Sequence, residues 1–217
     1  MRPDNEHQLD PTNDPARIGN FTASVLHSAI KKGRNGKYNE VGRQTLLDTK
    51  GAELDTGSID SNFQSLDMLA GNLNEPIAKE IYEQLTGRKI LDKEAIEHPT
   101  LPFFAASPDG VLEDDPSILV EIKCPKKKEH RRTIRTMEIK PEYLTQMTAQ
   151  IACMWHLGAR ECDFISYHNQ YEPKIHVIRF RPTKKMIKEL ETEVEKLTEE
   201  LIQDNLTVRK NQWRPGA

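Results

Sequence analysis

Two acidic residues and a lysine near the middle of the chain have the types and spacing needed for metal-assisted hydrolysis of a phosphodiester. Asp109 starts one apolar segment, and Glu121 and Lys123 lie two residues apart at the end of the next. Because alternate side chains of a β-strand share a face, Glu121 and Lys123 should point the same way. If the two segments pair as a hairpin, both carboxylates and the ammonium converge. They would then provide oxygen ligands for Mg²⁺ and a cation beside the attacking water.

The pattern of an acid, any residue and a lysine is weak alone, since the chain contains it four times. Only the copy at Glu121 follows an apolar run, Ile118 to Val120, that predicts a buried strand. An exposed cross-strand ion pair, which contributes little to stability, is the alternative interpretation of Glu121 and Lys123. At the end of an apolar strand such charges are costly unless a partner such as a metal ion compensates them. The other copies are Asp48 to Lys50, Glu138 to Lys140, and Glu172 to Lys174 with its strand-breaking proline.

Further short motifs flank this pair between Arg17 and Arg214. In chain order the set is Arg17–Ser24, Asn74-Glu75, Ser107-Pro108-Asp109-Gly110, Glu121-Ile122-Lys123-Cys124-Pro125, Tyr143-Leu144-Thr145-Gln146 and Gln212-Trp213-Arg214. Together these motifs resemble the lambda exonuclease family, also called YqaJ-like viral recombinases, within the PD-(D/E)xK nuclease superfamily. Their joint order carries the resemblance, because no motif outside the central pair is specific by itself.

The resemblance implies a fold and a metal site. The fold class is α/β, a PD-(D/E)xK nuclease core with a central mixed β-sheet flanked by helices. Asp109 and Glu121 would be the main metal ligands, with the backbone carbonyl of Ile122 completing the shell. Glu75 would add a third carboxylate for a second ion, although an exposed acid favoured by the helix macrodipole is the alternative. The implied cofactor is Mg²⁺, as two ions, for which Mn²⁺ could substitute.

Two polar residues near the metal ligands are expected to assist the chemistry. Lys123 could orient or deprotonate the attacking water and neutralise developing charge. Gln146 could hydrogen-bond the nucleophile or a phosphate, with a generic polar helix residue as the alternative. The family often places a second glutamine two residues after the first, whereas here Gln150 follows four residues later. That spacing keeps both glutamines on one helical face, so the sequence leaves open which one reaches the site.

Arg17, Ser24 and Ser107 together predict an anion pocket. A guanidinium binds phosphate bidentately, and hydroxyl groups add further donors. By resemblance, this pocket would hold the terminal 5′-phosphate of the strand being digested. Helix capping is the alternative role for the two serines.

A basic strip follows the candidate catalytic strand. The chain carries a net charge of −3, but residues 123–135 contain seven basic residues against one acid. A focused basic strip beside a carboxylate cluster suits a polyanion held at a metal site. A solvated basic loop or a targeting signal is the alternative. The predicted DNA-contacting residues are Lys126, Lys127, Lys128, Arg131, Arg132 and Arg135.

The composition limits the class of protein. With 217 residues, 36% hydrophobic and 30% charged, the chain fits one rather polar domain, expected at residues 16–217 after a flexible polar tail at 1–15. The apolar stretches are shorter than the roughly 20 residues that span a bilayer, so no membrane is expected. The tail has no apolar core typical of a signal peptide. Three cysteines cannot complete a disulfide framework or a four-cysteine cluster, which favours an intracellular, cytoplasmic location.

The elements that must position these residues follow from hydrophobic patterning and breakers. A first helix is expected at Val25 to Ile30, capped by Thr22 or Ser24. The other expected helices are Tyr38 to Leu47, Ser61 to Leu85 with possible breaks at Gly71 and Pro76, Pro141 to His156, and an amphipathic helix from Met186 to Leu201. The expected strands are Arg88 to Leu91, Phe103 to Ala106, Gly110 to Leu112, Ile118 to Lys123, Cys162 to Tyr167 and Lys174 to Phe180.

The residues and the resemblance together predict a Mg²⁺-dependent 5′-to-3′ exonuclease of duplex DNA. It would act from 5′-phosphorylated ends and produce mononucleotides and 3′ single-stranded overhangs for phage-type homologous recombination. The resemblance also implies a homotrimeric ring and a single-strand annealing protein as partner. A restriction- or repair-type endonuclease on the same core, or an inactive DNA-binding or annealing module, remains as an alternative.

Overall fold

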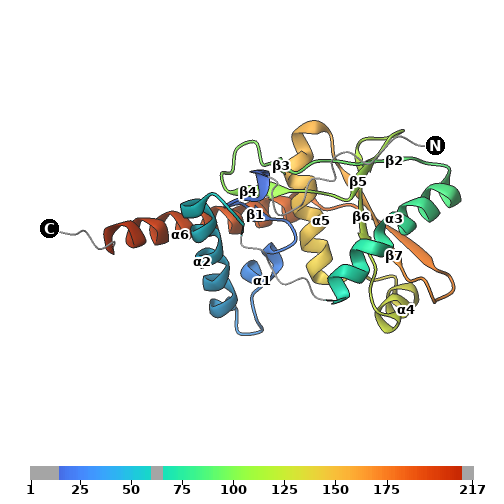
Figure 1. The fold of residues 1–217 in the computed structure, drawn as a ribbon, viewed down its shortest axis with the longest axis horizontal. Helices are drawn as coiled ribbons and strands as arrows, with labels where there is room; N and C mark the ends of the chain where they lie inside the picture. The colour runs from blue at the N-terminus through green and yellow to red at the C-terminus, as the bar shows by residue number, and fades with distance from the viewer. Residues whose placement is uncertain (1–14, 60–65, 212–217) are drawn as a thin grey trace.

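The computed structural model describes residues 15–59 and 66–211, and Figure 1 shows their arrangement. Two sequence-based expectations lie outside these residues. They are the N-terminal tail, apart from Pro15, and the motif Gln212-Trp213-Arg214. Among the described helices, none combines the length and the apolar character needed to cross a membrane.

The main sheet has five strands in the order β2-β5-β6-β7-β8. Only β6 and β7 run parallel, and the other neighbours are antiparallel. The sheet is therefore mixed, as predicted, and the apolar run before Lys123 forms a strand near its centre. The strands are β2 (Ile90–Leu91), β5 (Gly110–Leu112), β6 (Ile118–Lys123), β7 (Glu161–Tyr167) and β8 (Ile175–Phe180).

Helices cover both faces of this sheet (Figure 1). Helix α3 (Leu66–Thr86) packs on one face, where Val120 and Ile122 of β6 join a buried cluster with Tyr82. Helix α5 (Pro141–Met154) covers the other face with Leu119 of β6, and α6 (Lys184–Asn211) packs against α5. Because side chains alternate along a strand, Glu121 and Lys123 share the face of Leu119 and point toward α5.

A second sheet, which the sequence did not predict, holds three short strands in the order β1-β4-β3. It consists of β1 (Phe21–Thr22), β4 (Phe104–Ala106) and β3 (Ile96–Glu97). The expectation that residues 103–106 belong to the central sheet is wrong, because β4 pairs with β1 on one side and β3 on the other. This small sheet packs against α5 and brings the N-terminal segment next to residues 104–106.

The N-terminal helices differ from the sequence-based expectation. Thr22 lies in β1, and helix α1 (Leu26–Ile30) has Val25 as its N-cap without a side-chain cap bond, so the capping prediction is wrong. Helix α2 (Glu40–Thr56) is longer than the short helix predicted to end at Leu47. Its additional turns bury Lys50, Gly51 and Glu53, and it ends at Gly57 in the left-handed conformation.

Two other helices also run past the expected boundaries. Helix α3 is continuous although it contains Pro76, so neither Gly71 nor Pro76 divides it. Helix α6 extends to Asn211, ten residues beyond Leu201, and Figure 1 shows its C-terminal end projecting past α2. The basic strip forms a helix of its own, α4 (Lys127–Thr136), rather than a loop. Its buried side carries His130 and Thr133, which anchor it on the rest of the fold.

Candidate active site

The hairpin formed by β5 and β6 brings Asp109 and Glu121 to facing positions. Gly110 pairs with Val120, and the Asp109 N–H donates to the Val120 carbonyl at 3.1 Å. The Asp109 carboxylate also accepts a hydrogen bond from the Ile122 N–H at 2.6 Å. The sequence-based prediction of a hairpin at this point is therefore confirmed. One oxygen of Asp109 is held by the backbone of the neighbouring strand, which fixes the orientation of this carboxylate.

Glu121 is fully buried and has two close polar neighbours. Lys123, two residues along the same strand, forms an ion pair with its Oε1. From helix α5, Gln150 Nε2 donates to Glu121 Oε2 at 2.6 Å and to the Ser107 carbonyl at 3.3 Å. Gln150 is therefore the glutamine that touches the acidic pair, and it also ties this pair to the Ser107 segment.

Lys123 lies between the acidic pair and an aromatic ring. Its ammonium is 5.5 Å from the ring centroid of Tyr143 on α5, and this ring in turn stacks on Phe164. Burial opposes the charge of Lys123, but the nearby carboxylates of Glu121 and Asp109 outweigh this effect and raise its pKa. Lys123 is thus held as a cation at the site. Tyr143 received no role from the sequence, although it lies one helical turn before Gln146 in the same motif.

The carboxylates of the site repel one another. Burial and the charge of Glu121 raise the pKa of Asp109 well above its usual value, although Lys123 and the Ile122 N–H act in the opposite direction. The pKa of Glu75 on α3 is also raised, chiefly by burial and with a contribution from Glu121. Glu75 forms an ion pair with Lys79 at 3.8 Å. Within residues 15–59 and 66–211, no three His, Cys, Asp or Glu side chains are grouped closely enough to hold a metal ion, so Glu75 does not complete a three-acid cluster.

A cavity of about 170 Å³ adjoins Asp109 and contains all three residues of the predicted anion pocket. Its lining includes Arg17 from the N-terminal segment, Ser24 after β1, and Ser107 and Asp109 before β5. Gln146 of α5 lines the same cavity, whereas Gln150 lies behind it on Glu121. The two glutamines thus occupy different places, one facing the cavity and one supporting the acidic pair. Neither serine caps a helix.

The basic strip does not present all of its charges in the same way. Lys127, Lys128, Arg131 and Arg135 are exposed on α4. Arg132 instead forms ion pairs with Glu129 at 3.1 Å and Glu138 at 3.4 Å. A basin of about 810 Å³ lies beside the site, at the ends of β6 and β7. Its lining includes Lys126, Lys128, Lys140, Tyr143 and His168.

The donor atoms of the site fit a hard divalent cation. Asp109, Glu121 and the Ile122 carbonyl offer oxygen atoms, which Mg²⁺ prefers over nitrogen or sulfur. The side-chain oxygen of Gln150 is buried next to Glu121 without a hydrogen-bond partner in the described part of the chain. Burial, and after it the charge of Glu121, raise the pKa of Asp109, so a second negative charge is unfavourable at this place. A cation would relieve this repulsion.

The mixed sheet, the facing acids and the lysine two residues further along together define the PD-(D/E)xK nuclease core. A family model described as the YqaJ-like viral recombinase domain matches residues 14–156. The chain belongs to this family. A search of the curated proteins gives no match.

Solved structures support the same assignment. The chain is 33% identical to an alkaline exonuclease, LHK-Exo, from Laribacter hongkongensis, with a TM-score of 0.79 over 91% of this chain and 95% of the other. A structure of LHK-Exo in complex with dAMP matches over the same shares, at 32% identity and a TM-score of 0.79. A phage-related exonuclease from Haemophilus somnus 129PT shares the fold, with 14% identity and a TM-score of 0.59 over 85% and 96% of the two chains. The exonuclease relatives indicate that this chain is a nuclease.

Proposed function

We propose that this protein is a Mg²⁺-dependent exonuclease that digests one strand of duplex DNA from a 5′-phosphorylated end, in the 5′-to-3′ direction. The products would be mononucleotides and a 3′ single-stranded overhang. One observation carries the proposal. Arg17, Ser24 and Ser107 line the same cavity as Asp109, so the residues that would bind a terminal phosphate adjoin an acid that would act on the next phosphodiester.

The side chains of this cavity have distinct roles in the proposal. The guanidinium of Arg17 would bind the terminal phosphate through two parallel hydrogen bonds, and the hydroxyl groups of Ser24 and Ser107 would add donors. This anchoring would fix the first nucleotide and thereby align the scissile bond with Asp109 and Glu121. Gln146, which lines the cavity, would hydrogen-bond the phosphate or the attacking water.

The acidic pair and Lys123 would carry out the hydrolysis. Asp109, Glu121 and the Ile122 carbonyl would hold Mg²⁺, with Glu75 as an additional carboxylate for a second ion and Mn²⁺ as a substitute. When bound, the ion would polarise the phosphate and lower the pKa of a water molecule. Lys123 is held as a cation beside Glu121, so it would orient the water and stabilise negative charge as it develops on the phosphate. Gln150 would keep Glu121 in place.

Helix α4 and the neighbouring basin would hold the remaining DNA. The exposed charges of Lys127, Lys128, Arg131 and Arg135, together with Lys126 at the basin, would contact phosphates, whereas Arg132 is partly neutralised by Glu129 and Glu138. The LHK-Exo complex with dAMP supports release of mononucleotides. A homotrimeric ring around the DNA, a single-strand annealing partner and a role in phage-type recombination in the cytoplasm complete the proposal. Enclosure by a ring would retain an acidic protein on DNA.

The decisive experiment compares linear duplexes with 5′-phosphate or 5′-hydroxyl ends and a closed circular duplex, each with Mg²⁺ or with a chelator. We expect Mg²⁺-dependent release of acid-soluble nucleotides from linear DNA, faster from phosphorylated ends. Efficient cutting of the closed circle would instead identify an endonuclease. No release from any substrate would identify an inactive binding module.

Two substitutions separate chemistry from end recognition. Lys123→Ala should retain DNA binding and lose turnover by roughly a thousandfold or more, because it removes the cation that faces the developing charge. Arg17→Ala should mainly reduce processing of phosphorylated ends. Turnover and equilibrium DNA binding are measured on the same preparations. Normal cleavage by Lys123→Ala would show that the site is assigned to the wrong residues.

A further inference from the structure

A buried ion pair on helix α2 reaches the segment that carries Arg17. Lys50 and Glu53 lie one helical turn apart and are 6% and 5% exposed. The Lys50 ammonium is 2.9 and 2.8 Å from the two carboxylate oxygens of Glu53. Lys50 is also the lysine of an acid-any-lysine copy that lacks a strand context. This pair lies on α2, whereas Asp109 and Glu121 belong to the hairpin of β5 and β6.

Outside its own helix, the Glu53 carboxylate forms a hydrogen bond to the backbone of the N-terminal segment. Its Oε2 accepts a buried hydrogen bond from the Gly19 N–H at 2.8 Å. Gly19 has a φ of +68°, and a Cβ built on it would lie 2.3 Å from Leu54 Cδ2. The backbone at Gly19 is thus held between a charged acceptor and an apolar side chain. Both of these side chains come from the last turn of α2.

The other side of the same turn is also fixed. Asn20 Nδ2 donates to the Ala16 carbonyl at 2.9 Å and to Glu97 at 3.1 Å. The Asn20 N–H bonds to the Arg17 carbonyl at 3.3 Å, and Phe21 then enters the small sheet. Arg17, whose side chain lines the cavity next to Asp109, therefore belongs to a turn whose backbone is held by hydrogen bonds at Gly19 and Asn20.

The acceptor that holds the Gly19 N–H is a carboxylate rather than a neutral group. A buried ion pair seldom stabilises a protein more than well-packed apolar residues of similar volume would. An ionised carboxylate is, however, a stronger acceptor for a backbone N–H than a neutral group, and it fixes the distance and direction of the bond. Lys50 holds the Glu53 carboxylate in place through contacts to both of its oxygens. The pair thus suits the positioning of the Gly19 backbone better than it suits stabilisation.

We propose that Glu53, supported by Lys50, is a positioning residue that sets the preference for 5′-phosphorylated ends by fixing the Arg17–Asn20 turn against the cavity. The inference rests on the proposed function of that cavity. Glu53 does not touch DNA. Its loss lets the guanidinium of Arg17 move away from the position in which it binds the terminal phosphate, while the acids at Asp109 and Glu121 stay in place.

The test measures the ratio of initial rates on 5′-phosphate and 5′-hydroxyl duplexes, together with KM and kcat on each. In Glu53→Ala this ratio should fall on the order of tenfold, because a small displacement of an anchoring group weakens alignment strongly. The fall should appear as a raised KM on the phosphorylated duplex, with kcat on the hydroxyl duplex unchanged. Glu53→Gln retains an oxygen acceptor for Gly19 and should restore part of the ratio.

Two further variants separate positioning from stability. Lys50→Met/Glu53→Leu replaces the ion pair by apolar groups, so it should recover thermal stability and still lose the preference. Glu200→Ala is the matched control, since it removes the α6 partner of Arg43, a buried cation of the same helix α2. It should lower thermal stability and keep the wild-type ratio. Adding Arg17→Ala to Glu53→Ala should cause no further loss, because both changes remove the same interaction.

The outcomes distinguish this inference from the proposed function. If the wild-type enzyme does not discriminate between the two ends, the proposed function is wrong and the inference falls with it. If the wild type discriminates and both Glu53→Ala and the apolar double variant retain its ratio, the inference alone is overturned. Glu53 would then have a purely structural role.

Discussion

Neighbouring strands of the main sheet each bury a carboxylate, and the two differ in whether other carboxylates lie near them. Glu121 on β6 is 0% exposed and Asp163 on β7 is 3% exposed. Their registers differ by one residue, because Asp163 pairs with Val120 and Glu121 with Phe164. Side chains alternate along both strands, so Asp163 faces α3 and Glu121 faces α5. One sheet thus presents a buried acid on each of its faces.

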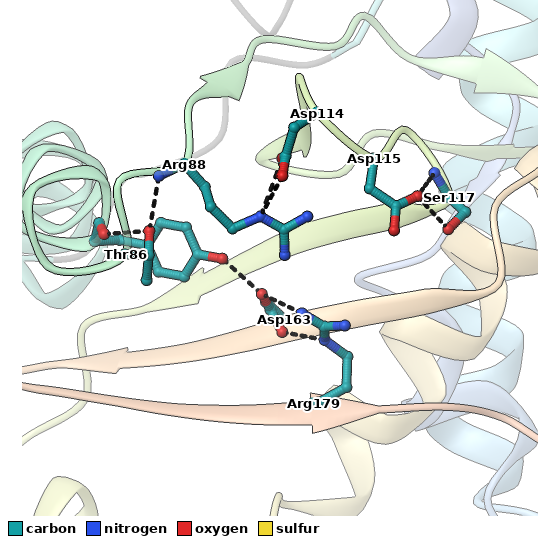
Figure 2. A network of polar contacts seen from close by, with 8 residues as sticks. Thr86, Arg88, Asp114, Asp115, Ser117, Asp163 and Arg179 are labelled. Atoms are coloured by element: carbon teal, nitrogen blue, oxygen red, sulfur yellow. Dashed lines mark hydrogen bonds and ion pairs between the residues drawn. The ribbon is translucent and has the colours of Figure 1, made fainter.

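The acid on the α3 face has strong donors on both of its oxygens. Figure 2 shows Asp163 receiving hydrogen bonds from Arg179 on β8 and from a tyrosine ring on α3. The tyrosine is Tyr82, whose hydroxyl lies 2.6 Å from Asp163 Oδ2, and Arg179 Nη2 lies 3.0 Å from the same oxygen. Burial and the bond to Asp163 together raise the pKa of Tyr82, which keeps its hydroxyl a donor. Both oxygens of Asp163 thus accept hydrogen bonds from the protein itself.

The acid on the α5 face also has a donor on each oxygen, Lys123 and Gln150, but two further carboxylates, Asp109 and Glu75, lie close enough to interact with it. Glu121 contributes to the raised pKa of Asp109 and of Glu75, and Lys123 is the cation that pairs with it. The difference teaches that burial of a carboxylate does not by itself mark a functional site. A site is marked by buried charge that its own neighbours leave partly uncompensated. Asp163 is therefore expected to support the fold and Glu121 to support the chemistry.

Glu121→Gln tests the chemical half of this comparison and should have the largest effect. Turnover on linear duplexes should fall on the order of 10⁴-fold, as for members of other catalytic groups that act as a unit. The fold should be retained, because Lys123 keeps the Asp109 carboxylate nearby. Acid-soluble nucleotide release and thermal unfolding measure the two effects. Turnover within tenfold of the wild type would place the essential acid elsewhere.

Asp163→Asn tests the structural half. It removes the buried anion that pairs with Arg179. It also replaces one carboxylate oxygen by an amide NH₂ group, which cannot accept the hydrogen bonds that Arg179 and Tyr82 donate. The free energy of unfolding should fall by about 3 kcal/mol, the lower end for loss of one partner of a buried ion pair, because Arg179 is 40% exposed and keeps its ion pair with Glu161. Turnover per folded molecule should stay within a few-fold of the wild type.

Tyr82→Phe is the matched milder variant, since it removes a single donor and leaves the pairing with Arg179. A loss of about 1.5–3 kcal/mol is expected from one hydrogen bond to a charged group. Urea unfolding compares the two variants with the wild type. An Asp163→Asn enzyme that unfolds normally but does not cleave DNA would reverse the roles assigned to the two acids.

The sequence predicts the α5 face of this comparison better than the α3 face. Glu121 and Lys123 follow an apolar run and stand two residues apart, so strand periodicity alone brings them together. Asp163 lies in a predicted strand as well, but its partners Tyr82 and Arg179 are separated from it by 81 and 16 residues. No local pattern pairs such residues. Contacts of this kind depend on which helix packs on which face.

Contacts between distant residues also explain why the sequence does not predict the structure of the N-terminal region. The segment around Phe21 has too short an apolar run to predict a strand, and its pairing with Phe104 is set by tertiary packing. Lys50 and Glu53 lie beyond the end of the helix that the sequence predicts at Leu47, and in the structure their pair is buried where Gly19 approaches. By contrast, β6, α5 and most of α6 follow from periodicity. Residues that act through the backbone of a distant segment leave no signal in the sequence.

A buried histidine packed against the same sheet extends the comparison to a neutral side chain. His130 of α4 is fully buried, with Nδ1 at 2.8 Å from Ser166 Oγ on β7 and Nε2 at 2.9 Å from the Pro173 carbonyl. Burial lowers the pKa of His130 below 6.5, and the neighbouring His168 and His176 act in the same direction, against the effect of the Pro173 carbonyl. Near neutral pH this group therefore needs no counter-charge.

His130→Gln should change the pH dependence of stability, and this effect is the smallest of the set. As the pH falls below about 6.5, the unfolded chain takes up a proton that the folded His130 resists, so the free energy of unfolding decreases. The loss ends once the pH is below the lowered folded-state pKa. Removing this proton site should flatten the decrease between pH 7 and pH 5 by at most about 1.4 kcal/mol per pH unit. Urea unfolding at several pH values would show this. An unchanged slope would mean that His130 takes up its proton equally in the folded and unfolded states, and a steeper decrease in the variant would mean that the folded protein favours the protonated ring.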